Sequence, residues 1–288
     1  MSNKKLSDKN EEQEEKVVKE MSFLDHLEVL RWHLIRSTVA IMVGAVAAFS
    51  FKKILFDKIL LAPAKTDFIT YKYLCELGEK INSPDLCIKE LPFTIISNSM
   101  AGQFTTHIWV SFIAGLIIAF PYILWEVWSF ISPALYKKER RMATVFIVIS
   151  SLLFFLGVLF GYYIISPLSV QFLVGYNVSS QVINYIPLSS YFSVLKQAVL
   201  ASAIMFELPV VIYFLSKLGL VSPQFMRTYR KHAIIVILII AAIITPPDIV
   251  SQIIVSIPVM ILYEVSIFIS SAIYKKRELT ESSEITEN

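Results

Sequence analysis

The residues best placed to do chemistry in this sequence lie in one short connector, FISPALYKKERR, which runs from Phe130 to Arg141. The connector holds a single acid, Glu139, among four cations, and it joins two long apolar stretches. A carboxylate set among cations stays ionised at neutral pH and binds a guanidinium through two parallel hydrogen bonds. Glu139 is therefore a candidate for binding cationic groups of a partner at a membrane face. From the residues alone, the alternative is a local salt bridge within its own basic cluster.

A second set of candidates consists of polar side chains within apolar stretches. Glu207 lies near the middle of one such stretch, where a carboxylate is costly unless it is paired, hydrated or protonated. We predict that Glu207 and, in the segment TPPDIVSQ, Gln252 face the bundle interior or a wet cavity. The alternative for Glu207 is a structural hydrogen bond between helices. Glu126 and Glu264 lie nearer the ends of their stretches, so reaching the interface is an equally good interpretation for them.

Six apolar stretches carry these residues and predict an all-α membrane protein with six transmembrane helices. A helix rises about 1.5 Å per residue, so about 20 apolar residues are needed to cross a core roughly 30 Å thick. The expected spans are 32–51, 105–131, 142–165, 191–218, 233–245 and 249–273. Pro167 is expected to stop the third span. The fifth span makes only about 20 Å of helix. Such a short span is accommodated by local thinning of the bilayer or by shelter among other helices, and a miscounted end is the alternative interpretation.

Composition agrees with a membrane protein. The chain is 56% hydrophobic and 17% charged, against about 25% charged residues in ordinary soluble domains. We expect a solvated cytoplasmic tail at residues 1–20, a membrane domain at 21–274 with a long outer loop at 52–104, and a C-terminal cytoplasmic tail at 275–288. We expect no nucleic-acid partner and no cofactor. We also expect no metal, because the four histidines are scattered along the chain and are better explained as interfacial residues than as metal ligands.

The distribution of basic residues predicts the orientation of the bundle. Lysine and arginine gather in the N-terminal tail, in the second and fourth connectors and at the C-terminal end, whereas residues 166–190 contain neither. Connectors rich in basic residues stay in the cytoplasm, so both termini are predicted to be cytoplasmic. The outer loop at 52–104 contains seven lysines, but long segments cross the membrane largely regardless of charge.

The outer loop also contains the only two cysteines of the chain, Cys75 and Cys87. If the loop faces an oxidising compartment, the two thiols can form a disulfide that closes a small loop. Two unpaired thiols are the alternative interpretation of the same residues.

Four motifs in a fixed order resemble the TatC subunit of the twin-arginine protein translocase over about residues 23–276. They are FLDHLEVLR at the start of the first span, FISPALYKKERR, FELPV in the fourth span and TPPDIVSQ between the last two. The resemblance implies a receptor, in the cytoplasmic (inner) membrane, for signal peptides that bear paired arginines. It also implies a concave, glove-like bundle, single-span partners of the TatA/TatB type, assembly into homo-oligomers, and export of folded proteins driven by the proton-motive force.

The resemblance also assigns roles to particular residues. It implies that Glu139 contacts the arginine pair, that Phe130 belongs to the same surface, and that Arg31 is the arginine of the first motif. The family usually has a second acid where this chain has Val29, and here the acid is Glu28. One residue is about 100° of helical rotation, so Glu28 does not automatically replace it. A basic residue expected near position 33 is also missing.

The sequence does not favour two other classes of function, a small-solute transporter and a membrane enzyme. A small-solute transporter commonly shows internal repeats with broken helices in corresponding halves, and no convincing repeat relates the first three spans to the last three. A membrane enzyme is not indicated either, because the chain contains no HExxH, no GxSxG and no pair of intramembrane aspartates. Flux of a small substrate in vesicles, or conversion of a substrate by the purified protein, would favour these alternatives.

The predicted orientation can be tested by labelling single cysteines from outside the cell. A cysteine introduced near Ser180 should react with an impermeant reagent, and one near Lys138 should be protected. The reverse pattern would invert the topology and remove Glu139 from the cytoplasmic face.

Overall fold

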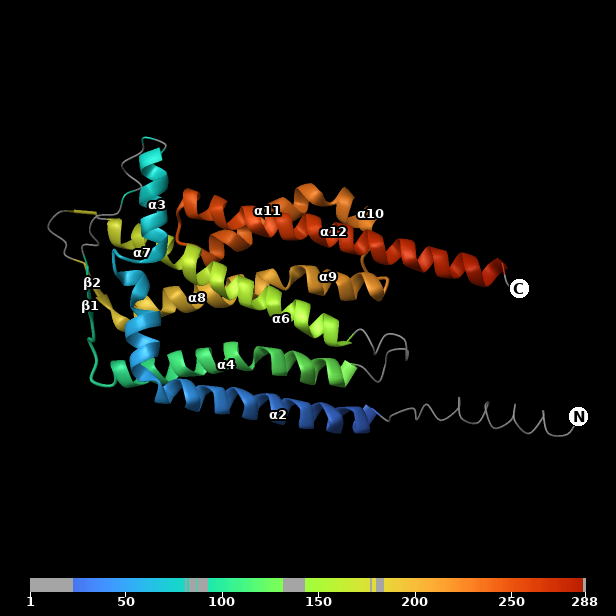
Figure 1. The fold of residues 1–288 in the computed structure, drawn as a ribbon, viewed down its shortest axis with the longest axis horizontal. Coiled ribbons are helices and arrows are strands. Elements are labelled where there is room, and N and C mark those ends of the chain that lie inside the picture. Colours follow the sequence, from blue (N-terminus) through green and yellow to red (C-terminus); the bar gives the residue numbers. More distant parts are fainter. Residues whose placement is uncertain are drawn as a thin grey trace, which may run out of the picture.

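The computed structural model of the chain describes residues 23–80, 82, 87, 93–131, 143–176, 178, 179 and 184–286. In these ranges the protein is helical apart from two short strands (Figure 1). The long helices run side by side. We call the end of the bundle where α2 begins and where α4 and α12 end the terminal end (Figure 1). The opposite end, where the two strands lie, is called the sheet end.

The elements follow one another in a simple order along the chain. They are α2 (Phe23–Ser50), the π-helix η1 (Ile54–Leu60), the 3-10 helix η2 (Ala62–Ala64), α3 (Ile69–Lys80), β1 (Thr94–Ile96), α4 (Gly102–Ile131), α6 (Ala143–Phe160), the π-helix η5 (Gly161–Ile165), α7 (Ser166–Gly175), β2 (Tyr185–Pro187), α8 (Leu188–Phe206), α9 (Leu208–Lys217), α10 (Pro223–Thr228), α11 (Arg230–Ile244) and α12 (Ile249–Thr286).

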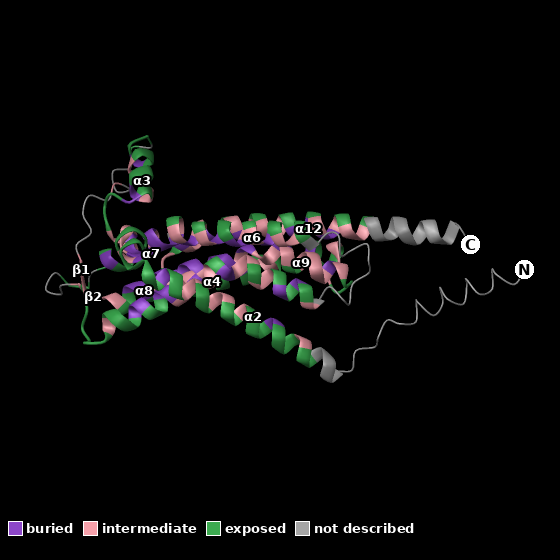
Figure 2. Cartoon of the chain, turned by 60° about the horizontal axis from the view of Figure 1, so that its bottom comes forward, coloured by how far each residue is buried: buried purple, intermediate pink, exposed green. Residues whose placement is uncertain are grey.

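Five helical segments in the described ranges are long and apolar enough to cross a membrane. They are Leu27–Ser50, Gly102–Phe130, Thr144–Gly175, Leu188–Lys217 and Ser251–Lys275. The helix that corresponds to the expected fifth span, α11, has 15 residues, which is about 22 Å at the helical rise. Many large apolar side chains along these helices are exposed, for example Val43 on α2 and Leu152 on α6 (Figure 2). This is the surface that a lipid-facing helix presents.

The expected stop at Pro167 is wrong, because the third apolar helix continues to Gly175. A π-helical turn at Gly161–Ile165 precedes α7, and Pro167 falls in the first turn of α7. A proline is tolerated there because the first amides of a helix have no partner within it. The side chain of Ser166 also donates to the Gly161 carbonyl at 2.8 Å, which satisfies a group of the irregular turn.

At two positions in the bundle, glycines allow helices to approach closely, as is common in membrane bundles. A Cβ on Gly115 of α4 would lie 2.7 Å from the Ile41 carbonyl of α2, and Gly44 faces Gly115 across the same contact. A Cβ on Gly161 would lie 2.6 Å from the Ala198 carbonyl of α8. Side chains at either position would push the helices apart.

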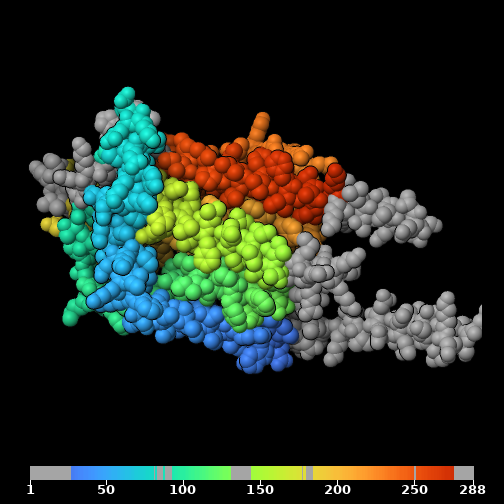
Figure 3. All heavy atoms as spheres, in the orientation of Figure 1, coloured from blue at the N-terminus to red at the C-terminus, as the bar shows by residue number. Residues whose placement is uncertain are grey.

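The predicted outer loop is structured at the sheet end. Its first part, from η1 to α3, forms a wall across the ends of the long helices (Figure 3). β1 pairs in parallel with β2, with Thr94 opposite Tyr185. Tyr71 of α3 is fully buried and donates to the carbonyls of Pro63 (2.9 Å) and Pro167 (3.2 Å), so α3 is fastened to α7.

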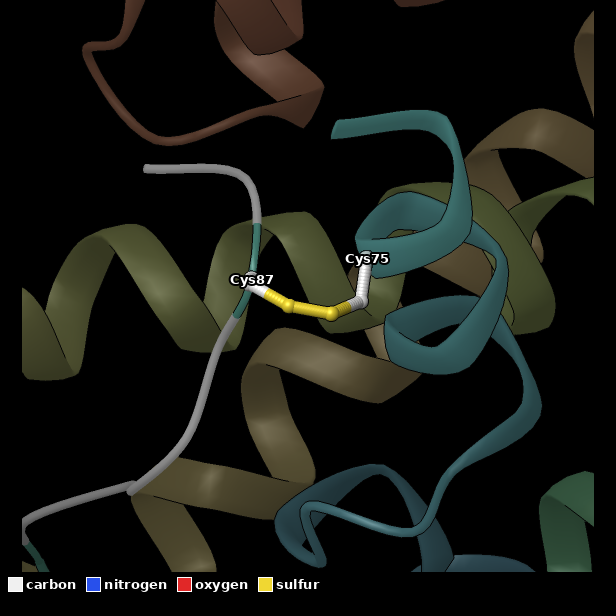
Figure 4. The surroundings of a disulfide bond; sticks show 2 residues. All are labelled: Cys75 and Cys87. Atoms are coloured by element: carbon white, nitrogen blue, oxygen red, sulfur yellow. A yellow bond between two sulfur atoms is a disulfide. The ribbon is translucent and has the colours of Figure 1, made fainter. Parts of the chain in front are cut away.

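Cys75 of α3 and Cys87 are joined in a disulfide (Figure 4). The bond closes a segment with a sequence separation of 12. It ties the residues that follow α3 back to the middle of this helix. Of the two interpretations open from the sequence, the structure has the bonded one.

We predict that the disulfide also forms in the mature protein. Replacing both cysteines by serine should destabilise the α3 region by up to about 3 kcal/mol in the loop-entropy model, because the unfolded segment regains its freedom. The check is peptide mass spectrometry without reduction, together with limited trypsin digestion at Lys72 and Lys80. Two free thiols in protein isolated from its native membrane would contradict the prediction.

Candidate functional site

The terminal ends of α2 and α4 meet at a buried carboxylate. Glu126 of α4 is only 4% exposed. Its Oε2 lies 2.5 Å from Nδ1 of His33 on α2, and its Oε1 accepts a hydrogen bond of 2.7 Å from the hydroxyl of Tyr122. The Nε of Arg36 lies 3.7 Å from Oε2. The glutamate therefore joins two helices whose contacting residues are 93 positions apart in the sequence.

Phe130 lies one helical turn beyond Glu126 and continues this cluster. Its ring meets the ring of His33 in an edge-to-face arrangement, with centroids 6.0 Å apart and an interplanar angle of 68°. Phe130 is half-buried. The predicted site residue Phe130 thus packs against α2, the helix that carries the two other predicted residues Glu28 and Arg31.

The remaining residues predicted for the cationic partner are placed only in part. Glu28 and Arg31 lie near the start of α2, and both are exposed at the terminal end. Glu139 and the rest of the connector at 132–142 lie outside the described residues. The structure therefore places Phe130, Glu28 and Arg31 at one end of the molecule, and the position of Glu139 is untested.

The pairing of His33 with Glu126 was not predicted from the sequence. Glu126 was considered equally able to reach the interface, but it is buried between helices. A basic residue was expected near position 33, where this chain has His33. The side chain of His33 pairs with Glu126. One signal was available: Tyr122, Glu126 and Phe130 are spaced four apart, which puts them on one face of α4.

Glu207 lies at the junction of α8 and α9, where the helix is interrupted before Pro209. The hydroxyl of Ser150 donates to Glu207 Oε2 at 2.6 Å. Among the residues that the structure describes, the buried Oε1 has no hydrogen-bond partner. A buried carboxylate oxygen without a donor is costly, which favours a proton or a water molecule on this group.

Gln252 serves a different purpose from Glu207. Its Nε2 donates to the Leu238 carbonyl of α11 at 3.0 Å. In a similar way, Gln197 of α8 donates to the Ile243 carbonyl at 2.6 Å. The two glutamines therefore fasten α11 to its neighbours, and Gln252 and Glu207 are not brought together as one polar site by these contacts.

An apolar pocket of about 720 Å³ lies between α2, η1, α4, α6, η5 and α8. Its lining includes Ala47, Leu55, Ile113 and Phe192, and its charged lining residue is Lys196. The ammonium group of Lys196 lies 5.8 Å from the centroid of the Phe192 ring. The volume falls within the range of about 300–1,000 Å³ that ligand pockets occupy.

The described residues contain one grouping of potential metal ligands, Cys75, Glu79 and Cys87. The disulfide removes both thiolates from this set. A metal is bound by the thiolate form of cysteine, so this grouping does not form a metal site.

Comparisons with known proteins show which family has this arrangement. A family model described as "Sec-independent protein translocase protein (TatC)" matches residues 25–258. A curated TatC of Blattabacterium is 42% identical over 90% of this chain and 98% of its own length. Similar proteins from Bacillus subtilis (TatCy) and Aquifex aeolicus (TatC) are 33% and 35% identical, over 93% and 91% of this chain and 95% and 100% of theirs.

Solved structures agree with the sequence comparisons. The chain is similar to a crystal structure described as "Twin Arginine Translocase Receptor- TatC", with a TM-score of 0.64 and 34% identity. The match covers 86% of this chain and 99% of the solved one. A second crystal structure of the same receptor, in DDM, matches with a TM-score of 0.62 and 35% identity, over 85% of this chain and 99% of that one.

We predict that Glu207 is required for export but not for insertion. Glu207→Gln should insert and still accept from Ser150, and Glu207→Leu should insert because it removes an unsatisfied polar group. Both should reduce export of a folded reporter that carries a twin-arginine signal peptide. Ser150→Ala is the matched control that keeps the carboxyl group, and it should export better than either. Normal export by both Glu207 variants would show that the carboxyl group has no role in transport.

Proposed function

This chain belongs to the TatC family of Sec-independent protein translocase proteins, and from that premise we propose that it is the receptor subunit of a twin-arginine translocation system. In this role it binds signal peptides with paired arginines. It then passes folded proteins across the membrane together with single-span partners of the TatA/TatB type, using the proton-motive force. We expect it to have no catalytic activity.

The observation that supports the proposal most directly is that an aromatic ring, an acid and an arginine lie together at the terminal end. Phe130 packs against α2 there, and α2 exposes Glu28 and Arg31. The connector after Phe130 supplies Glu139 among four cations. Guanidinium groups are less strongly hydrated than ammonium groups and fit a carboxylate with two parallel hydrogen bonds. A single acid at this position suits selection of arginine over lysine.

Glu139 is proposed as the direct partner of the arginine pair, and Glu28 as the second acid. The exposed side chain of Glu28 is accessible to a peptide at the terminal end. Supporting this assignment, Glu126 is already occupied by His33 and Tyr122. Among the residues of α2 with described side chains, Glu28 is the exposed acid, which makes it our candidate partner for the second guanidinium group.

The proposed topology places the terminal end in the cytoplasm. We propose six spans across the cytoplasmic (inner) membrane, with α11 as a short fifth span added to the five long ones, and both termini on the cytoplasmic side. The basic connectors support this orientation. We further propose that the bundle has the concave, glove-like shape implied by the resemblance, and the apolar pocket between α2, α4 and α8 supports that shape.

Partner subunits are proposed to bind within the membrane. The exposed apolar side chains of α11 support this, because a helix of 15 residues leaves part of the bilayer thickness unspanned. Four of these side chains are Ile235, Val236, Ile239 and Ile243. A single-span partner or a second copy of this chain can cover them, which is consistent with a homo-oligomeric assembly.

The receptor role predicts a loss of signal-peptide binding when Glu139 is removed. Glu139→Ala should weaken binding by about 30-fold to several thousand-fold, since loss of one partner of a desolvated charge pair costs roughly 2–5 kcal/mol. Glu139→Asp should be milder because the charge survives. Glu28→Ala should produce a further loss if this acid holds the second arginine. The measurement is crosslinking of a twin-arginine precursor to the protein in membranes.

The matched control for this experiment is Glu76→Ala, which removes an exposed acid on α3 at the sheet end. This variant should crosslink like the unmodified protein. Undiminished crosslinking of the precursor to Glu139→Ala would refute the receptor assignment for this connector.

A further inference from the structure

The contact between α2 and α4 has two well-separated points of attachment. At one, Gly44 and Gly115 let the two backbones touch. At the other, His33 pairs with Glu126. His33 precedes Gly44 by 11 residues and Glu126 follows Gly115 by 11, which is three turns, or roughly 16 Å, along each helix. The two points therefore lie on the same face of each antiparallel helix.

Both oxygens of the Glu126 carboxylate have partners within the bundle. Oε1 accepts from Tyr122 and Oε2 from His33, and Arg36 stands 3.7 Å from Oε2. Glu126 is only 4% exposed, so a guanidinium group of a signal peptide cannot reach it without separating α2 from α4. Glu126 is therefore not itself a binding group for the arginine pair.

The pair instead controls the position of Phe130. Tyr122, Glu126 and Phe130 are successive members of one stripe on α4, and His33 touches both Glu126 and the Phe130 ring. At this end α4 also packs on α6 and α9 through Trp128, whose ring contacts Phe146 and Phe214. The His33–Glu126 pair adds a polar contact that joins α2 to α4 next to Phe130.

We propose that Glu126 and His33 form a clamp that positions Phe130 for signal-peptide binding. This inference rests on the receptor function proposed above. Both residues are positioning residues, since neither contacts the peptide. The glycine contact keeps α2 and α4 together when the clamp is removed, so loss of the clamp changes binding more than it changes folding.

The first test measures the affinity of a fluorescent twin-arginine signal peptide for the purified full-length protein in detergent. Glu126→Ala and His33→Ala should each weaken binding about tenfold or more per folded molecule. The conservative Glu126→Gln, which keeps an acceptor oxygen, should recover most of the affinity. The matched control is Glu264→Gln, which breaks an ion pair of 2.8 Å with Arg230 that joins α12 to α11, and it should leave affinity within twofold.

A double-variant comparison separates positioning from a general loss of stability. If the clamp acts through Phe130, then Glu126→Ala combined with Phe130→Ala should bind no more weakly than Phe130→Ala alone. Additive losses in the double variant would overturn the proposal, because they would mean that Glu126 acts independently of Phe130.

The second test observes the clamp without any peptide. Spin labels at cysteines replacing Leu30 of α2 and Val127 of α4, both exposed, should give a narrow distance distribution that broadens in Glu126→Ala. An unchanged distribution, or full affinity in both Ala variants, would overturn the clamp. Failure of the unmodified protein to bind the peptide would instead overturn the proposed receptor function, and the coupling with it.

Discussion

The constraint on which this structure depends is that polar groups in hydrocarbon must find partners inside the protein. Side chains of serine and glutamine meet this requirement at several irregular points of the helices. Ser202 donates to the Gly157 carbonyl at 2.7 Å, next to the π-helical turn of η5. Gln197 and Gln252 donate to carbonyls of α11. These bonds allow short and interrupted helices to exist where a regular helix would otherwise be needed.

The same constraint separates the acidic groups of the long helices by how well each is satisfied. Glu126 has partners on both oxygens, His33 and Tyr122, and the Nε of Arg36 lies 3.7 Å from Oε2. Glu207 has one donor, Ser150, for two oxygens. A satisfied group holds structure together, whereas an unsatisfied one is free to exchange a proton or a partner. The two glutamates are therefore suited to different tasks although both lie in apolar helices.

Sequence reasoning succeeded where a local pattern decides the outcome. Apolar run length predicted the helices, and motif order predicted the family, which the comparisons confirm. It failed where the outcome depends on a distant partner. Pro167 was predicted to end a helix because the π-helical turn that accommodates it is not encoded by a recognised pattern. The sequence did not decide whether Glu126 is buried or reaches the interface, because its partner His33 lies 93 residues earlier. Spacing along one helix does not reveal which side chain of another helix faces a given residue.

The phenol of Tyr71 gives the sheet end an attachment that involves no ionic charge. It fastens α3 by donating to two carbonyl groups, and burial raises the pKa of this phenol well above its ordinary value. The phenol of Tyr71 therefore stays neutral and able to donate at physiological pH. Its attachment of α3 involves no ionic charge. The terminal end is built from carboxylates, arginines and an imidazole, whose interactions weaken as salt screens them where they reach water. A rise in salt concentration therefore weakens the exposed charged contacts at the terminal end. It leaves the attachment of α3 through Tyr71 at the sheet end unaffected.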